Sequence, residues 1–245
     1  MNFASVNGLS YIGNTNNSAK IKKNGKKGVS TYIIYLAPSK QSGYNVCPKA
    51  TTECVAACLS ESGHNRIDTS GRINRARIKK TQLFFTTRAN FVDHVAREIN
   101  NAQKRAAKAG LEFSVRLNGT SDLSPALFKG SDNLTLLERF PHIQFYDYTK
   151  VLNRVKLLNQ YNNYDLTFSY SGSNWNECEL ALQQGVRVAV VFAGKKLPTQ
   201  YMGREVVDGD ISDIRYWDPK DCIVGLRFKK VRNKIEKSNF VVSVN

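Results

Sequence analysis

The chain has 245 residues, of which 41% are hydrophobic and 23% are charged. These proportions exclude wholesale disorder, and the length allows one sizeable core. Its 36 Lys and Arg residues against 20 Asp and Glu residues give a net charge of +16, which attracts phosphate polymers and other anions.

The predicted elements begin with residues 1–29, which are rich in Asn, Gly, Ser and Lys. We expect them to form a less ordered N-terminal arm or a small edge hairpin. The apolar and β-branched run at 31–36 predicts the first strand, and the loop after it carries three cysteines. Residues 70–109 contain no Pro and place apolar residues at helical spacing. This pattern predicts two helices with a break near 86–90.

Strands and helices alternate in the rest of the chain. Strands are predicted at 113–117, 143–147, 166–170, 186–192 and 223–228, and helical segments at 124–140, 151–161 and 175–184. This alternation is typical of βαβ units with a parallel sheet. No glycine-rich dinucleotide motif or P-loop is present. We therefore expect residues 30–245 to form a single α/β domain of repeated βα units, in a partial or irregular (β/α) barrel.

Polar residues gather where the predicted strands end, which is where α/β folds bind ligands. Acid/base or substrate-anchoring groups belong at such positions. We predict a catalytic set of Asp122, Asp147 and Lys150. We predict a cofactor-binding set of Asn118, Thr120, Ser171 and Asp210.

Cys47, Cys54 and Cys58 form a C-x6-C-x3-C pattern in the loop after the first strand. A spacing of four places Cys54 and Cys58 on one helical face, and Cys47 can fold back onto them. Thiolates are soft ligands that suit zinc or an iron–sulfur cluster, so we predict a metal centre. Three thiolates leave one iron of a four-iron cluster open to a small molecule such as S-adenosylmethionine. Structural zinc needs a fourth ligand, and buried core thiols remain the plain alternative. The candidate fourth ligands are His64, Cys178 and Cys222.

Two further patterns each allow two interpretations. Asp208, Asp210 and Asp213 offer carboxylates for Mg²⁺, as in a nuclease, or simply mark a turn. The basic segment 72–80 offers a phosphate-binding face or a solvated helix. A zinc- or thiol-stabilised nucleic-acid-binding protein without catalysis therefore stands beside the enzyme hypotheses. Aromatic side chains that would stack bases, or else belong to the core, are Tyr146, Tyr148, Tyr170 and Trp175.

Six short motifs occur at 35–38 (YLAP), 47–51 (CPKAT), 71–74 (GRIN), 116–122 (RLNGTSD), 141–150 (PHIQFYDYTK) and 208–213 (DGDISD). Together they resemble phage proteins of the "gene product eighty-eight" type over residues 30–230. The resemblance implies a phage origin. No membrane span or signal peptide is visible, so we expect the protein in the cytoplasm, which for a phage protein is that of the host cell.

The position of the cysteine loop is in turn similar to the layout of radical S-adenosylmethionine enzymes. These enzymes place a cluster loop after the first strand of a partial (β/α)6 barrel, with a usual spacing of C-x3-C-x2-C. This similarity implies a four-iron, four-sulfur (4Fe-4S) cluster and S-adenosylmethionine as cofactors. It implies radical chemistry on a nucleotide, nucleic acid or protein, with zinc as the alternative metal.

Overall fold

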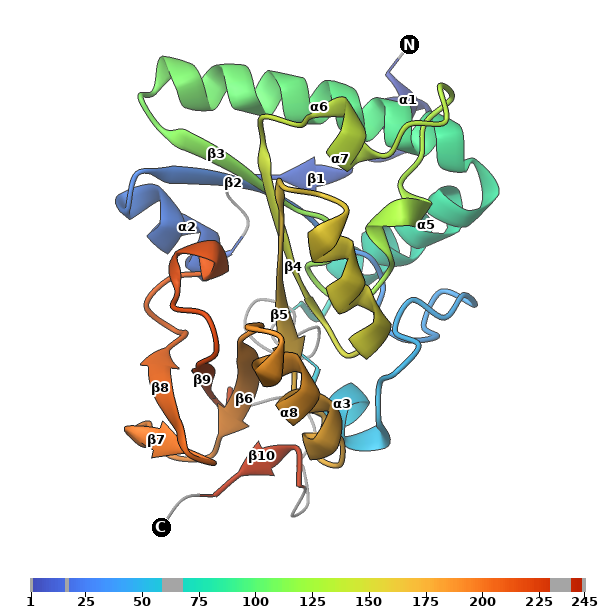
Figure 1. Ribbon diagram of the computed structural model, residues 1–245. Coiled ribbons are helices and arrows are strands. Elements are labelled where there is room, and N and C mark those ends of the chain that lie inside the picture. The colour runs from blue at the N-terminus through green and yellow to red at the C-terminus, as the bar shows by residue number, and fades with distance from the viewer. Residues whose placement is uncertain (1, 16–17, 59–67, 230–238, 244–245) are drawn as a thin grey trace.

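The structure is a computed structural model that describes residues 2–15, 18–58, 68–229 and 239–243 (Figure 1). Its centre is a ten-stranded sheet with helices packed on it. The strands are, in their order across the sheet, β1 (Gly13–Asn14), β2 (Val29–Ile34), β3 (Glu112–Arg116), β4 (Gln144–Thr149), β5 (Tyr164–Ser169), β6 (Val188–Phe192), β9 (Ile223–Arg227), β8 (Arg204–Asp208) and β7 (Gln200–Tyr201). A short last strand, β10 (Val241–Val242), pairs with β6.

The six neighbours from β2 to β9 are parallel, and they follow one another in chain order. A doubly wound sheet reverses its strand order at a switch point between its parallel strands. From β2 to β9 this sheet shows no reversal, and only beyond β9 does the order run back to β8 and β7. The path nevertheless ends at antiparallel β1 on one side and at the antiparallel β7–β8 pair on the other. The α/β class with repeated βα units is therefore confirmed, whereas barrel closure is not.

The two helices predicted in 70–109 are confirmed as α5 (Arg72–Thr86) and α6 (Arg88–Lys108). The break falls at Thr87, and α6 buries a stripe that includes Val92, Val95 and Ile99 against β2 and β3. This spacing puts one face of a helix on the core. The other helical elements are α1 (Phe3–Val6), α2 (Ala19–Lys26), α3 (Thr52–Ala56), α7 (Leu136–Arg139) and α8 (Trp175–Gln183), with 3-10 turns at η2 (Pro125–Leu127), η3 (Leu152–Asn159) and η4 (Arg215–Trp217).

The segment for which we expected an arm or an edge hairpin contributes α1, α2 and the edge strand β1. Ala4 and Ile12 are fully buried. A Cβ atom at Gly13 would stand 2.2 Å from the Tyr32 ring, so only glycine allows β1 to approach β2 this closely. Residues of this segment thus belong to the core of the molecule.

The face of the sheet opposite α6 is covered by α2 and by the segment 209–218. Asp213 and Arg215 are each only 1% exposed. The Asp213 carboxylate accepts hydrogen bonds from Arg116 (2.7 Å) and from the Tyr146 hydroxyl (3.2 Å). The Asp213 backbone N–H donates to the Asn24 side-chain oxygen (2.8 Å). These contacts fasten the segment across β3 and β4. Among the described residues, no helix is long and apolar enough to cross a membrane.

Candidate functional site

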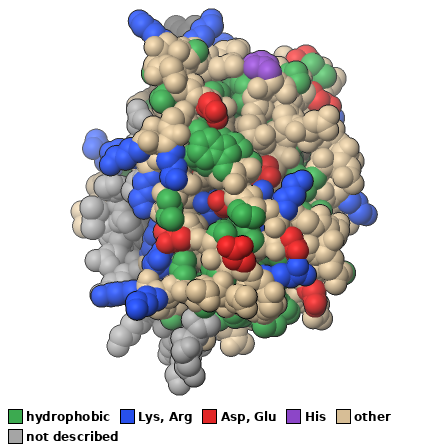
Figure 2. All heavy atoms as spheres, turned by 60° about the vertical axis from the view of Figure 1, so that its left-hand side comes forward, with side chains coloured by type: hydrophobic (Ala, Val, Ile, Leu, Met, Phe, Trp, Pro, Cys, Tyr) green, Lys and Arg blue, Asp and Glu red, His purple; other side chains and the backbone are tan. Residues whose placement is uncertain are grey.

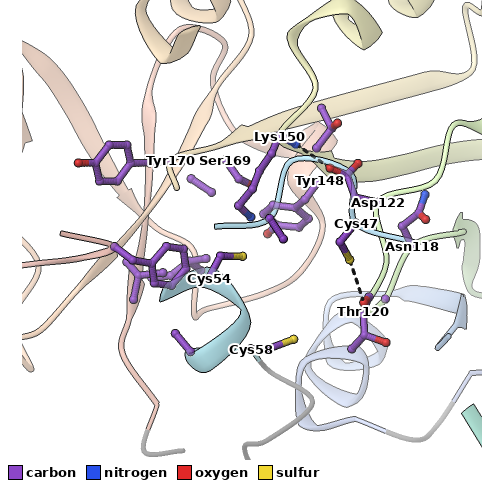
Figure 3. A pocket seen from close by; sticks show the side chains of 18 of the residues that line it. Cys47, Cys54, Cys58, Asn118, Thr120, Asp122, Tyr148, Lys150, Ser169 and Tyr170 are labelled. Atoms are coloured by element: carbon purple, nitrogen blue, oxygen red, sulfur yellow. Dashed lines mark hydrogen bonds between the residues drawn. The ribbon is translucent and has the colours of Figure 1, made fainter. Parts of the chain in front are cut away.

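A cavity of about 230 Å³ opens at the carboxyl ends of the parallel strands. Its wall includes the ends of β3, β4, β5, β6 and β9, the cysteine loop and Phe240. Figure 3 shows side chains from these separate elements around one space. Of the residues predicted to form a site, eight line the cavity: Cys47, Cys54, Cys58, Asn118, Thr120, Asp122, Lys150 and Asp210.

The three cysteines reach the cavity from the loop before the short helix α3 (Cys47), from the middle of α3 (Cys54) and from just beyond its end (Cys58). Thr51 caps α3 by accepting a hydrogen bond from the Cys54 N–H (3.1 Å), and its hydroxyl donates to the Ser171 carbonyl (3.1 Å). The predicted cofactor residue Ser171 does not line the cavity; instead, its backbone anchors the helix that carries Cys54. All three thiols are free.

Cys47 is partly buried and packs against the hydrophobic core. Its sulfur accepts a hydrogen bond from the Ser39 N–H (3.4 Å) and lies 3.9 Å from the Thr120 carbonyl oxygen. Burial raises the pKa of the Cys47 thiol to about 11, and the nearby Cys58 and Asp122 charges add to the effect. In the absence of a bound cation, Cys47 is therefore a neutral thiol at pH 7.

Lys150 lies between the cysteine loop and the polar strand ends (Figure 3). Its backbone N–H donates to the Asp122 carboxylate (2.9 Å), which also forms an ion pair with Arg154. Its ammonium group is hydrogen-bonded to Cys54. Burial favours loss of the Lys150 proton, but the Cys54 and Asp122 charges outweigh it and raise the pKa of this ammonium above its usual value. Lys150 is thus a fixed cation in the cavity.

Asp147, predicted as catalytic, does not line the cavity. Its carboxylate accepts hydrogen bonds from the Asn118 N–H (2.8 Å) and side-chain amide (3.1 Å), and it lies 3.4 Å from the Tyr164 hydroxyl. Burial raises the pKa of Asp147 to about 7, against the opposing effect of the Arg116 charge and the Asn118 hydrogen bonds. Asp147 holds the turn that begins at Asn118, and this turn presents Thr120 and Asp122 to the cavity.

The wall residue Arg116 was not predicted to contribute to the site, whereas its neighbour Tyr148 was expected to stack bases or to belong to the core. The Arg116 guanidinium lies 4.6 Å from the centre of the Tyr148 ring and forms an ion pair with Asp213 (2.7 Å). Both side chains line the cavity. The sequence signal for Arg116 is a charged residue within a predicted strand of the core sheet. A charge that is buried there needs an ionic partner or a ligand.

The three cysteines predict either a zinc ion or an iron–sulfur cluster, and these two need different arrangements of thiols. No cluster of three or more His, Cys, Asp or Glu side chains in the described part of the chain surrounds a single ion. Ligands of one zinc ion share a centre at about 2.3 Å from each sulfur, so they must lie close together. A four-iron cluster spreads its thiolates over separate irons. The three thiols in the cavity wall are soft donors, the type that binds iron–sulfur clusters.

The proposed fourth zinc ligands lie elsewhere or outside the described residues. Cys178 is fully buried in the core beneath α8, and Cys222 lies against the Pro219 carbonyl (3.2 Å). Neither lines the cavity. His64 lies outside the described residues.

The three carboxylates at 208–213 are each engaged by arginine. Arg227 forms ion pairs with Asp208 (2.8 Å) and Asp210 (3.4 Å), and Arg116 forms one with Asp213. The Asp208 side chain also accepts from the Asp210 N–H (2.9 Å), as in an Asx turn. Among the described residues, these carboxylates form no three-ligand ion site.

The basic helix α5 is only partly a surface feature. Arg77 is buried over the Tyr35 ring, and Lys80 donates to the Ile12 carbonyl (2.7 Å), while Arg72, Arg75 and Lys79 are exposed. The four aromatic residues predicted either to stack bases or to belong to the core also fall into two groups. Tyr148 and Tyr170 line the cavity, whereas Tyr146 is buried beside Asp213 and Trp175 packs on Tyr201.

Comparison with known proteins gives one match. The model of a family described as Gene product 88 matches residues 9–243. No curated protein and no solved structure matches the chain. The family match covers the strands, the cysteine loop and the cavity, and none of the comparisons relates the chain to the radical S-adenosylmethionine enzymes.

Proposed function

The chain belongs to the Gene product 88 family, and we propose that it is an iron–sulfur enzyme with a four-iron, four-sulfur cluster on Cys47, Cys54 and Cys58. The observation that supports this most is the presence of all three thiols in the wall of one cavity. That cavity lies at the carboxyl ends of parallel strands, where α/β folds bind ligands. The wall keeps polar and apolar groups together, as a ligand site does.

The strand order supports a finer proposal for the architecture. The parallel strands β2 to β9 follow the chain without reversal, as the strands of a barrel do. We propose that they form the wall of a partial (β/α) barrel with the cysteine loop at its mouth. The loop follows the first of these strands, β2.

When bound, the cluster would supply one-electron chemistry, with S-adenosylmethionine as the co-reactant at the iron that lacks a protein ligand. The chain's own residues set the conditions for it. Lys150 and Cys54 line the same cavity, so the Lys150 ammonium would lie near a cluster held on this thiol. Val191 and Leu226 add apolar surface to the cavity wall. A nucleotide, nucleic acid or protein remains the proposed substrate.

Purification without oxygen tests the cluster. We expect a brown protein with about four iron atoms and four sulfides per chain. Cys54→Ala should lose most of the iron, because it removes one of three ligands. Cys178→Ala is the matched control, since this thiol lies in the core away from the cavity. Colourless protein with one zinc per chain would exclude the cluster.

A second candidate, a nucleic-acid-binding protein without catalysis, is favoured by the net charge of +16. In Figure 2, Lys and Arg side chains gather towards the left and lower edges of the face, and Asp and Glu side chains lie nearer its centre. This candidate predicts binding of single-stranded oligonucleotides that weakens steeply with salt. Binding that is unchanged in Asp122→Asn and Lys150→Gln would favour it over an enzyme.

A further inference from the structure

Among the described residues, the charged groups of the cavity wall form pairs, with one exception. Asp213 is matched by Arg116, and Asp122 by Arg154. Asp210 is matched by Arg227 and lies 3.8 Å from Lys229. Every carboxylate of the wall therefore has a cationic partner.

Lys150 is the cation that this pairing leaves over. In the described part of the chain it forms no ion pair with a carboxylate, and the Asp122 carboxylate binds its backbone N–H instead. Its ammonium contacts the Cys54 thiol, and it lies 5.9 Å from the centre of the Phe240 ring. A partly buried ammonium group that no carboxylate binds keeps hydrogen-bond donors available in the cavity wall.

We propose that Lys150 binds an oxyanion, a phosphate or a carboxylate, of the molecule that occupies this cavity. A charged oxygen at this position would restore the balance that the wall lacks. It would also accept the hydrogen bonds that an ammonium group offers beyond the one to Cys54. The proposal rests on the proposed function only in that both take this cavity as the ligand site. It does not require a cluster, because side chains of the protein hold the anion.

The rest of the wall indicates what the oxyanion is attached to. Tyr148, Tyr170, Phe228 and Phe240 line the same cavity. Aromatic faces of this kind stack on planar rings, and a nucleobase is such a ring. The ligand class that combines a planar ring with an oxyanion is a nucleoside derivative that carries a phosphate or an amino-acid carboxylate.

Three adenosine compounds separate these sources of the oxyanion. We would measure the binding of AMP, S-adenosylmethionine and adenosine to the full chain by calorimetry at one fixed salt concentration. We expect AMP or S-adenosylmethionine to bind at least about tenfold more tightly than uncharged adenosine, because a charged hydrogen bond contributes this much. Preference for AMP assigns the oxyanion as phosphate, and preference for S-adenosylmethionine assigns it as carboxylate.

Variants then assign the effect to Lys150. Lys150→Gln should weaken the preferred anion by roughly 10- to 100-fold and leave adenosine unchanged. Lys150→Arg keeps the charge and should retain most of the affinity. Lys156→Gln is the matched control, because Lys156 is exposed on η3 and does not line the cavity. Circular dichroism verifies that each variant is folded.

The inference is overturned if adenosine binds as tightly as both AMP and S-adenosylmethionine, if none of the three compounds binds, or if Lys150→Gln binds the preferred compound as the wild type does. Iron-free protein measured in parallel separates this result from the cluster. Lys150-dependent anion binding by a chain that never takes up iron would sustain the inference and defeat the proposed function. Iron uptake without anion binding would do the reverse.

Discussion

Glu98 on α6 and Lys150 at the end of β4 are both partly buried charges, but they differ in the number of groups that bind them. The Glu98 carboxylate accepts hydrogen bonds from the Ile12 and Gly13 N–H groups (both 2.9 Å) and from the Tyr32 hydroxyl (2.5 Å). A ring nitrogen of His94 lies 3.0 Å from it. Burial would raise the pKa of Glu98, but these hydrogen bonds, that of His94 foremost, lower it below its usual value.

Lys150 has only the Cys54 thiol where Glu98 has four partners. The Glu98 cluster is closed, because its carboxylate is saturated by groups of the chain and it fastens the N-terminal segment to α6. The wall around Lys150 is open to a ligand. A saturated charge contributes to stability, whereas a cation that no carboxylate binds can pair with a ligand and is typical of a binding site.

The largest effect should come from opening the closed cluster. Glu98→Gln places an amide NH2 against groups that are themselves donors, so it leaves at least one buried donor unsatisfied. We expect the free energy of unfolding in urea to fall by about 3 kcal/mol. Glu112→Gln, at the exposed start of β3, is the control and should change it by less than about 0.5 kcal/mol. Equal effects of the two variants would contradict the distinction between closed and open clusters.

The pH dependence of stability tests the Glu98 cluster through Lys80, a buried cation near Glu98. Burial lowers the pKa of Lys80 to about 8, against the opposing pull of Glu98. The folded chain then holds fewer protons here than the unfolded chain between pH 8 and about 10.4. Stability must rise with pH across this window, by roughly 2–3 kcal/mol from this group.

The measurement is the difference between the stability curves of the wild type and Lys80→Met from pH 7 to 10. Subtraction removes the contributions of tyrosines and other lysines, which titrate in both proteins. A flat difference curve would show that the Lys80 ammonium keeps its ordinary pKa in the folded chain.

The sequence predicted the parts of the fold that depend on local patterns. The helical stripe of α6 and the alternation of strands with helices are properties of neighbouring residues, so periodicity finds them. The positions of residues 1–29 and 209–218 depend on contacts between distant residues, such as Ile12 with Glu98 and Asp213 with Arg116. No local pattern encodes such contacts.

The site residues, too, divide into those that local sequence patterns predict and those that depend on contacts between distant residues. Cys47, Asp122 and Lys150 line one cavity, as expected from the alignment of parallel strand ends. Asp147 does not, because successive strand residues face opposite sides of the sheet. Tyr148 lies against Arg116 on one face, while Asp147 binds Asn118 on the other. This alternation was visible in the sequence, but which face carries the site depends on how the chain covers the sheet.

The smallest effect, and the sharpest contrast with Glu98, is expected for Lys150→Met without ligand. Methionine keeps the length of the side chain and removes the charge that has no carboxylate partner. The free energy of unfolding should therefore change by less than about 1 kcal/mol, where Glu98→Gln lowers it by about 3 kcal/mol. Added AMP or S-adenosylmethionine, whichever binds, should stabilise the wild type according to its concentration and affinity but not the Met variant. A loss of stability as large as that of Glu98→Gln would mean that Lys150 is held as firmly by the folded chain as Glu98, and that the cavity wall is already balanced without a ligand.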